Sequence, residues 1–270
     1  MTGALAILGQ QDVAPAVRPP GPVERGLEDA WQLARSRMWR AGYRWRSFAL
    51  WRRFDLRSLD LSTVKLKIPN GQLPDCENCI ELCCTGPNAR VSLRLLDIAR
   101  LVDHGHAAHI VKDPVLDADN RRDKQIEKQH SWARREADGS VFHRVFPVLA
   151  RDATGTCMFL TADRLCGVYP GWPLSCARYP YALDRQLKVI FYAKGCTSTV
   201  TVQPADAPVR VRALARAVID AYNQRIKDVV TLALAPDRLA ELGLLEHLSL
   251  AHWPLRLAGT PVGPLSVRVP

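Results

Sequence analysis

Residues 76–84 read Cys76-Glu77-Asn78-Cys79-Ile80-Glu81-Leu82-Cys83-Cys84, so that four thiols fall within nine residues. The other cysteines of the chain all lie in one later segment, at Cys157, Cys166, Cys176 and Cys196. A buried thiol packs like a small apolar side chain, and packing alone gives no reason for such crowding. Thiols at short, fixed spacings are what a thiophilic metal ion or an iron–sulfur cluster requires, because several sulfurs must converge on one small volume.

Disulfide bonds and redox-active thiols are the alternatives to metal binding, since the number of cysteines is even. The chain has 270 residues, whereas disulfide frameworks are typical of much shorter secreted domains. Residues 1–16 have no basic region ahead of their short apolar run, so they do not read as a signal peptide. Adjacent cysteines such as Cys83 and Cys84 also do not readily pair with each other. We therefore favour a cytoplasmic protein whose eight cysteines bind metal.

The motifs around the cysteines resemble those of the YkgJ-type cysteine-cluster family, over about residues 70–200. The resemblance rests on Cys-x2-Cys-x3-Cys-Cys from Cys76, on Cys-Met-Phe-Leu from Cys157, on Cys-Gly-Val-Tyr from Cys166 and on Trp-Pro-x2-Cys-x2-Tyr-Pro ending at Pro180. That family is described as a zinc- or iron-chelating domain and is similar to part of flagellin lysine N-methylase. The chain departs from the family pattern at Trp172, where the family usually has arginine, and at Ala177, which separates Cys176 from Arg178.

The resemblance and the spacing together predict a cysteine-cluster metal-binding protein that coordinates zinc or iron through thiolates. A 4Fe-4S cluster is one form that the iron would take. Two alternatives stay open: a protein-modifying enzyme of the flagellin lysine N-methylase type, and a redox or electron-transfer partner that uses the cluster. The sequence names no catalytic residue for either, since it has no phosphate-binding loop, dinucleotide fingerprint or nucleophile elbow. His104, His106 and His109 suit the end of a helix better than a metal site.

A basic stretch precedes the cysteines. Residues 1–27 are rich in proline and predict a flexible segment. Over residues 28–58, apolar side chains recur at helical spacing, and arginines crowd the same stretch, at positions 35, 37, 40, 44, 46, 52 and 53. Such an amphipathic helix suits an anionic membrane surface or nucleic acid. We favour another interpretation, in which the Trp and Met stripe packs on the metal domain and the arginines are solvated.

The whole pattern predicts an α+β fold, in which a small cysteine-rich metal-binding core of short strands and loops (residues 59–203) packs with several helices. Helices are expected over 92–104, 206–233 and 236–243, and strands over 64–68, 141–150, 156–160 and 187–193. Residues 204–270 are expected to form a C-terminal helical segment and tail. The formal charge is +10. Besides the metal or cluster, a protein partner is compatible with this composition.

Overall fold

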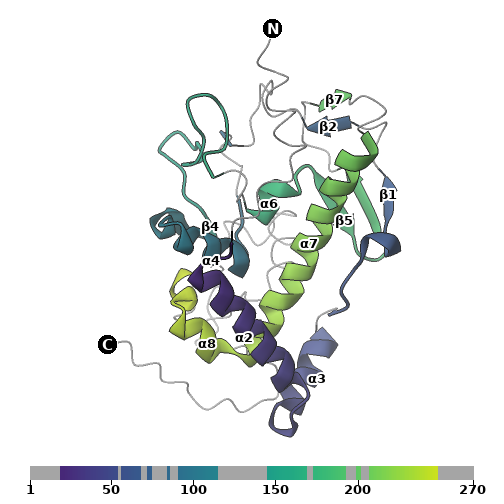
Figure 1. The fold of residues 1–270 in the computed structure, drawn as a ribbon, viewed down its shortest axis with the longest axis vertical. Coiled ribbons are helices and arrows are strands. Elements are labelled where there is room, and N and C mark those ends of the chain that lie inside the picture. The colour runs from purple at the N-terminus through teal and green to yellow at the C-terminus, as the bar shows by residue number, and fades with distance from the viewer. Residues whose placement is uncertain are drawn as a thin grey trace.

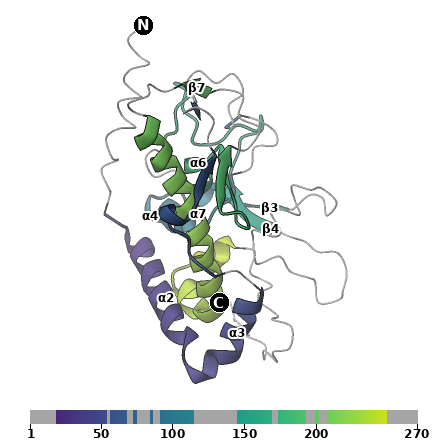
Figure 2. The same cartoon turned by 90° about the vertical axis from the view of Figure 1, so that its right-hand side faces the viewer.

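The computed structural model describes residues 19–53, 56–67, 72–74, 84–85, 91–114, 145–168, 173–192, 199–201 and 207–248. Figures 1 and 2 show it in two views at right angles. Its helices are α2 (Pro22–Met38), α3 (Arg44–Arg53), α4 (Leu95–Asp103), α6 (Leu174–Ala177), α7 (Ala207–Leu234) and α8 (Pro236–Glu241), with 3-10 turns at Ala41–Tyr43, Leu61–Thr63, Ala107–His109 and Leu244–His247. Its strands are β1 (Lys65–Lys67), β2 (Gln72–Pro74), β3 (Ile110–Pro114), β4 (Val145–Leu149), β5 (Tyr181–Asp184), β6 (Val189–Tyr192) and β7 (Thr199–Thr201). The fold is α+β, as predicted.

Helix α7, 28 residues long, is the axis of the molecule (Figure 1). Its C-terminal half packs against α2 and α3 in a cluster that contains Leu50 and Val230. Its N-terminal half packs through Val218 on the sheet formed by β1, β6 and β5. Another cluster joins α2, α4 and α8, and it reaches Cys157 and Phe159. The segment that carries the later cysteines is therefore attached to the apolar core.

The strand pairings fold the second half of the chain back onto the first half. β1 lies parallel to β6, with Lys65 opposite Val189, and β5 lies antiparallel on the other side of β6. β2 pairs with β7, so the residues just before the first cysteine group lie beside those that follow Cys196 in the sequence. β4 pairs with β3 along its whole length.

The strand predicted over 156–160 is wrong. Cys157 forms only an isolated bridge to Arg151, and Leu160 forms another to Cys166. Alternating apolar residues in this stretch serve two consecutive turns rather than a ladder, because both edges of β4 are occupied: β3 pairs with one, and Ser92 bridges to Val148 on the other. None of the described helices combines the length and the apolar character that crossing a bilayer requires.

The basic segment differs from the single helix predicted over 28–58. Helix α2 begins at Pro22, where proline suits the first turn, so residues 22–27 are helical and not part of a flexible segment. The helix ends at Met38, and the backbone at Arg40 is extended, with ψ of 143°, before the 3-10 turn that leads into α3. The apolar periodicity thus continues across a break in the helix.

The predicted packing of the aromatic stripe on the metal domain is also wrong for α3. Ala30 and Ala34 of α2 are buried against the rest of the chain, and Trp31 is half-buried. By contrast, Trp45 and Phe48 expose more than half of their side-chain surface. Helix α3 packs on the core through the side that carries Leu50, which is fully buried.

The start of α2 is capped by a residue of another helix. Gly21 precedes α2 and offers no side-chain acceptor. The two carboxylate oxygens of Asp103, at the end of α4, instead accept the amide hydrogens of Val23 and Glu24, each at 2.9 Å. A Cβ atom at residue 21 would lie 2.3 Å from this carboxylate, so glycine leaves the room that the cap needs. A negative charge at this end also interacts favourably with the helix dipole.

Replacing Asp103 with alanine is expected to lower the free energy of unfolding by about 1 kcal/mol, the usual cost of losing an N-cap. Urea denaturation measures this loss, and amide exchange should rise first in the opening turn of α2. Asp103→Asn keeps one acceptor oxygen and serves as the matched control, with a smaller loss. Equal stability of Asp103→Ala and the wild type would contradict the assigned cap.

Candidate thiol centre

The described part of the chain contains Cys84, Cys157, Cys166 and Cys176. The other predicted ligands, Cys76, Cys79, Cys83 and Cys196, lie outside the described residues. The end of the first cysteine group nevertheless meets the later segment, because the amide of Cys157 donates a hydrogen bond of 2.7 Å to the carbonyl oxygen of Cys84. Cys84, the last cysteine of the first group, therefore lies beside the turn that carries Cys157.

Two tight turns position Cys157 and Cys166. In the first turn, the Oδ1 atom of Asp152 accepts the amide hydrogens of Thr154 and Thr156 at 2.8 and 2.9 Å. The chain then doubles back again, and the amide of Gly167 donates to the carbonyl oxygen of Phe159 at 2.7 Å. Both thiols contact the same apolar cluster as a result.

Cys176 lies on the short helix α6, which the N-terminal region of α4 holds in place. The Oδ1 atom of Asp97 accepts the amide hydrogen of Leu174 at 2.9 Å. The hydroxyl of Ser175 donates to the carbonyl oxygen of Ser92. A helix of four residues has too few internal hydrogen bonds to be stable alone, so these two contacts fix where Cys176 lies.

The four thiols form one electrostatic group. Burial raises the pKa of Cys176 well above its ordinary value, and the nearby Cys84 and Cys166 raise this pKa further, as do Asp97 and Cys157. Burial also raises the pKa of Cys157, with a further contribution from Cys84. Buried thiols that raise one another's pKa do not ionise together unless a cation compensates their charge.

The donor set suits a thiophilic metal, and part of that set is missing from the described residues. The four described cysteines are thiols rather than half-cystines. Among the described residues, no three or more Cys, His, Asp or Glu side chains are arranged so that they could hold a metal ion. A complete site therefore needs donors from the remaining cysteines, a closer approach of the described ones, or both.

Arginines buried near the thiols provide positive charge. Burial and the proximity of Arg94 lower the pKa of Arg178, while the nearby Cys176 raises it. Arg94 is half-buried, and burial lowers its pKa against the opposing effect of Asp228 and Asp97. Its Nη1 atom has no hydrogen-bond acceptor among the described residues. Cations beside a thiol favour its thiolate form.

Two buried carboxylates accompany Arg94. Burial raises the pKa of Asp97 to about 6, although the amides of Arg94 and Leu174 donate to its carboxylate. Burial raises the pKa of Asp228 likewise to about 6, against the effect of the neighbouring Arg94. Sequence reasoning missed this group, because charged residues within helical periodicity read as solvated. The one available signal was Asp97, which follows the helix start at the position where acidic residues are favoured.

The histidines and the aromatic residues near Cys176 have structural roles. The rings of His106 and His109 meet the edge of Phe159 at centroid distances of 5.0 and 5.3 Å. The amide of Tyr179 donates to the carbonyl oxygen of Cys176 at 3.1 Å, and Pro180 is buried. Trp172, where the chain departs from the family pattern, lies outside the described residues.

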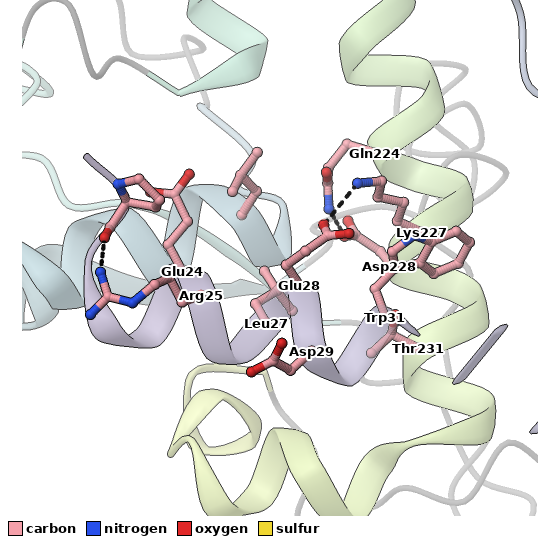
Figure 3. Close-up of a pocket in the computed structure, with 12 residues that line it drawn as sticks. Glu24, Arg25, Leu27, Glu28, Asp29, Trp31, Gln224, Lys227, Asp228 and Thr231 are labelled. Carbon is pink, nitrogen blue, oxygen red and sulfur yellow. Dashed lines mark hydrogen bonds and ion pairs between the residues drawn. The ribbon is translucent and has the colours of Figure 1, made fainter. Parts of the chain in front are cut away.

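A cavity of about 590 Å³ lies elsewhere, between α2, α4 and α7 (Figure 3). Trp31 and Leu27 form apolar walls, and Asp228 and Gln224 of α7 contribute polar groups. Gln224 donates to Asp228 at 2.8 Å, and Lys227 pairs with Glu28 at 3.1 Å across the cavity. The described residues that line it include no cysteine, although Asp228 belongs both to this lining and to the charged group around Arg94.

Comparisons of the chain with protein-family models, with curated proteins and with solved structures found no match.

Proposed function

We propose that the chain is a cysteine-cluster metal-binding protein, which coordinates zinc or an iron–sulfur cluster through thiolates. The observation that carries the proposal is geometric: Cys84, Cys157 and Cys166, which come from separate segments, contact one apolar cluster, and the amide of Cys157 donates to the carbonyl oxygen of Cys84 at 2.7 Å. Packing needs no such convergence, whereas a thiophilic centre requires it. The resemblance of the cysteine motifs to the YkgJ-type family supports the same proposal.

The proposed ligands are drawn from the eight cysteines Cys76, Cys79, Cys83, Cys84, Cys157, Cys166, Cys176 and Cys196. Arg178 and Arg94 partly compensate the net negative charge that several thiolates keep after they bind a divalent ion. A zinc ion held by cysteines alone would stabilise the fold, and a 4Fe-4S cluster would transfer electrons. A reducing compartment such as the cytoplasm keeps these thiols available.

Replacing Cys166 or Cys176 with serine is expected to lower the metal content of the purified protein by roughly tenfold or more, since even residues that merely orient a ligand cost 10–100-fold in affinity. The protein is purified anaerobically, and metal and acid-labile sulfide are measured per chain. Iron with sulfide identifies a cluster, and zinc without sulfide identifies a zinc site.

Leu165→Ser is the matched control for Cys166→Ser, because Leu165 is the neighbouring residue and is exposed. This variant should keep the metal content of the wild type. Wild-type protein purified without metal, or serine variants that retain the full metal content, would overturn the proposal.

A further inference from the structure

The segment from Ala30 to Phe54 holds seven arginines and no acidic residue. Four large aromatic side chains within it are exposed: Trp39 by 80%, Trp45 by 56%, Phe48 by 55% and Trp51 by 48%. Isolated exposed apolar residues are ordinary, but four exposed aromatic rings within thirteen residues mark an interaction surface. We call these four residues, with the exposed Arg40, Arg44 and Arg52, the basic aromatic surface.

The basic aromatic surface is held rigidly by buried contacts on its other side. Leu50 of α3 is fully buried in the cluster with α7. The hydroxyl of Ser47 donates to the carbonyl oxygen of Met38 at 2.9 Å, which joins α3 to the end of α2. Arg37 forms a two-bond ion pair with Asp237 of α8, at 2.6 and 2.9 Å. The exposed rings are therefore presented to solvent by an anchored scaffold.

The arginines of this surface are available to an anionic partner. Arg40, Arg44 and Arg52 form no ion pair with the described residues of the chain, in contrast to Arg37. Arg46 lies over the ring of Tyr43, at 5.9 Å from its centroid. Because the segment has no acidic residue of its own, its charge is complementary to a negatively charged surface.

We propose that the basic aromatic surface docks on an anionic lipid bilayer. Tryptophan is favoured at the level of lipid headgroups, and arginines near an anionic leaflet strengthen binding. The turn between α2 and α3 forms one end of the molecule in both views (Figures 1 and 2), so the surface projects outward.

A single-stranded nucleic acid is the alternative partner, and it would stack its bases on aromatic faces in a groove. Here Trp45 and Phe48 stack on each other, with centroids 5.8 Å apart.

The docking surface and the thiol centre are separate. α6, which carries Cys176, lies far from the α2–α3 turn in both views. The inference therefore does not depend on the proposed metal. Bilayer binding would place a thiol centre near a membrane without inserting it.

Co-sedimentation of the full chain with vesicles tests the proposal. The wild type should bind vesicles that contain phosphatidylcholine and phosphatidylglycerol. Its affinity for vesicles of phosphatidylcholine alone should be lower by roughly tenfold or more. Arg40→Glu/Arg44→Glu should bind anionic vesicles roughly tenfold or more weakly, and Trp45→Ala/Trp51→Ala should also lose binding. Arg185→Glu/Arg212→Glu is the charge-matched control on other exposed positions and should bind like the wild type.

Each variant must first match the wild type in melting temperature and metal content, so that loss of folding is not mistaken for loss of docking. The proposal is overturned if the wild type ignores anionic vesicles or if both arginine pairs have equal effects. It is also overturned if the surface binds a labelled single-stranded oligonucleotide, measured by anisotropy, and binds no vesicle.

Discussion

Amide exchange in residues 151–168 and 173–177 is expected to accelerate by roughly a hundredfold or more when a chelator removes metal under reducing conditions. Apart from the core contacts of Cys157 and Phe159 and the two hydrogen bonds that hold α6, these segments have little packing to order them. Cys157 and Phe159 are buried, but the side chains of residues 161–165 are exposed, and the backbone there forms turns rather than a ladder. Because metal binds thiolates of the folded chain only, its binding free energy contributes directly to folding.

Helix α7 is the internal control for this experiment. Residues such as Val229 and Val230 are buried in the cluster with α2 and α3, which contains no cysteine among its described members. Their exchange should change by less than about threefold, because packing and helical hydrogen bonds persist without metal. Equal protection of the cysteine loops before and after chelation would mean that packing holds them. That result would favour redox thiols over ligands.

Replacing Leu50 with alanine is expected to lower the free energy of unfolding by about 3 kcal/mol, within the range found for buried leucines. The side chain is fully buried between α3 and α7, and its loss leaves a cavity that a helix anchored on both sides cannot close. Guanidinium denaturation measures the change. Leu50→Met conserves volume and should cost less than about 1.5 kcal/mol.

Trp51 is the matched comparison, since it follows Leu50 directly and exposes 48% of its surface. Trp51→Ala should cost about 1–2 kcal/mol, because roughly half of the removed surface already contacts water. A larger loss for Trp51→Ala than for Leu50→Ala would show that α3 packs through its aromatic face. It would remove the basis of the proposed bilayer surface as well.

Helices with long, uninterrupted periodicity could be predicted from the sequence alone. The helix predicted over 206–233 is observed as α7, and the one over 92–104 as α4. Gly105 and Gly243 follow helices and have positive φ, of 75° and 69°, as glycine allows. Such elements depend on neighbours three and four residues apart, so a local reading suffices.

Features that depend on distant residues could not be predicted in this way. The break after Met38 leaves the apolar spacing intact, so periodicity does not reveal it. The parallel pairing of β1 with β6 joins residues that no local pattern connects. In the site, cysteine spacing indicated the thiols, whereas the buried group of Arg94, Asp97 and Asp228 depends on how α4 meets α7. Leu50 and Trp51 illustrate the same limit, since the larger apolar residue is the exposed one.

The borrowed cap of α2 has a consequence for synthesis on the ribosome. Val23 and Asp103 are 80 residues apart, so at usual elongation rates α2 waits roughly 4–16 s for its cap. Glu28 and its partner Lys227 are 199 residues apart, so α2 waits roughly 10–40 s for its contact with α7. Helix α2 is therefore among the last of the described helices to be fully packed, and part of its apolar face stays open to chaperones until α7 has been made.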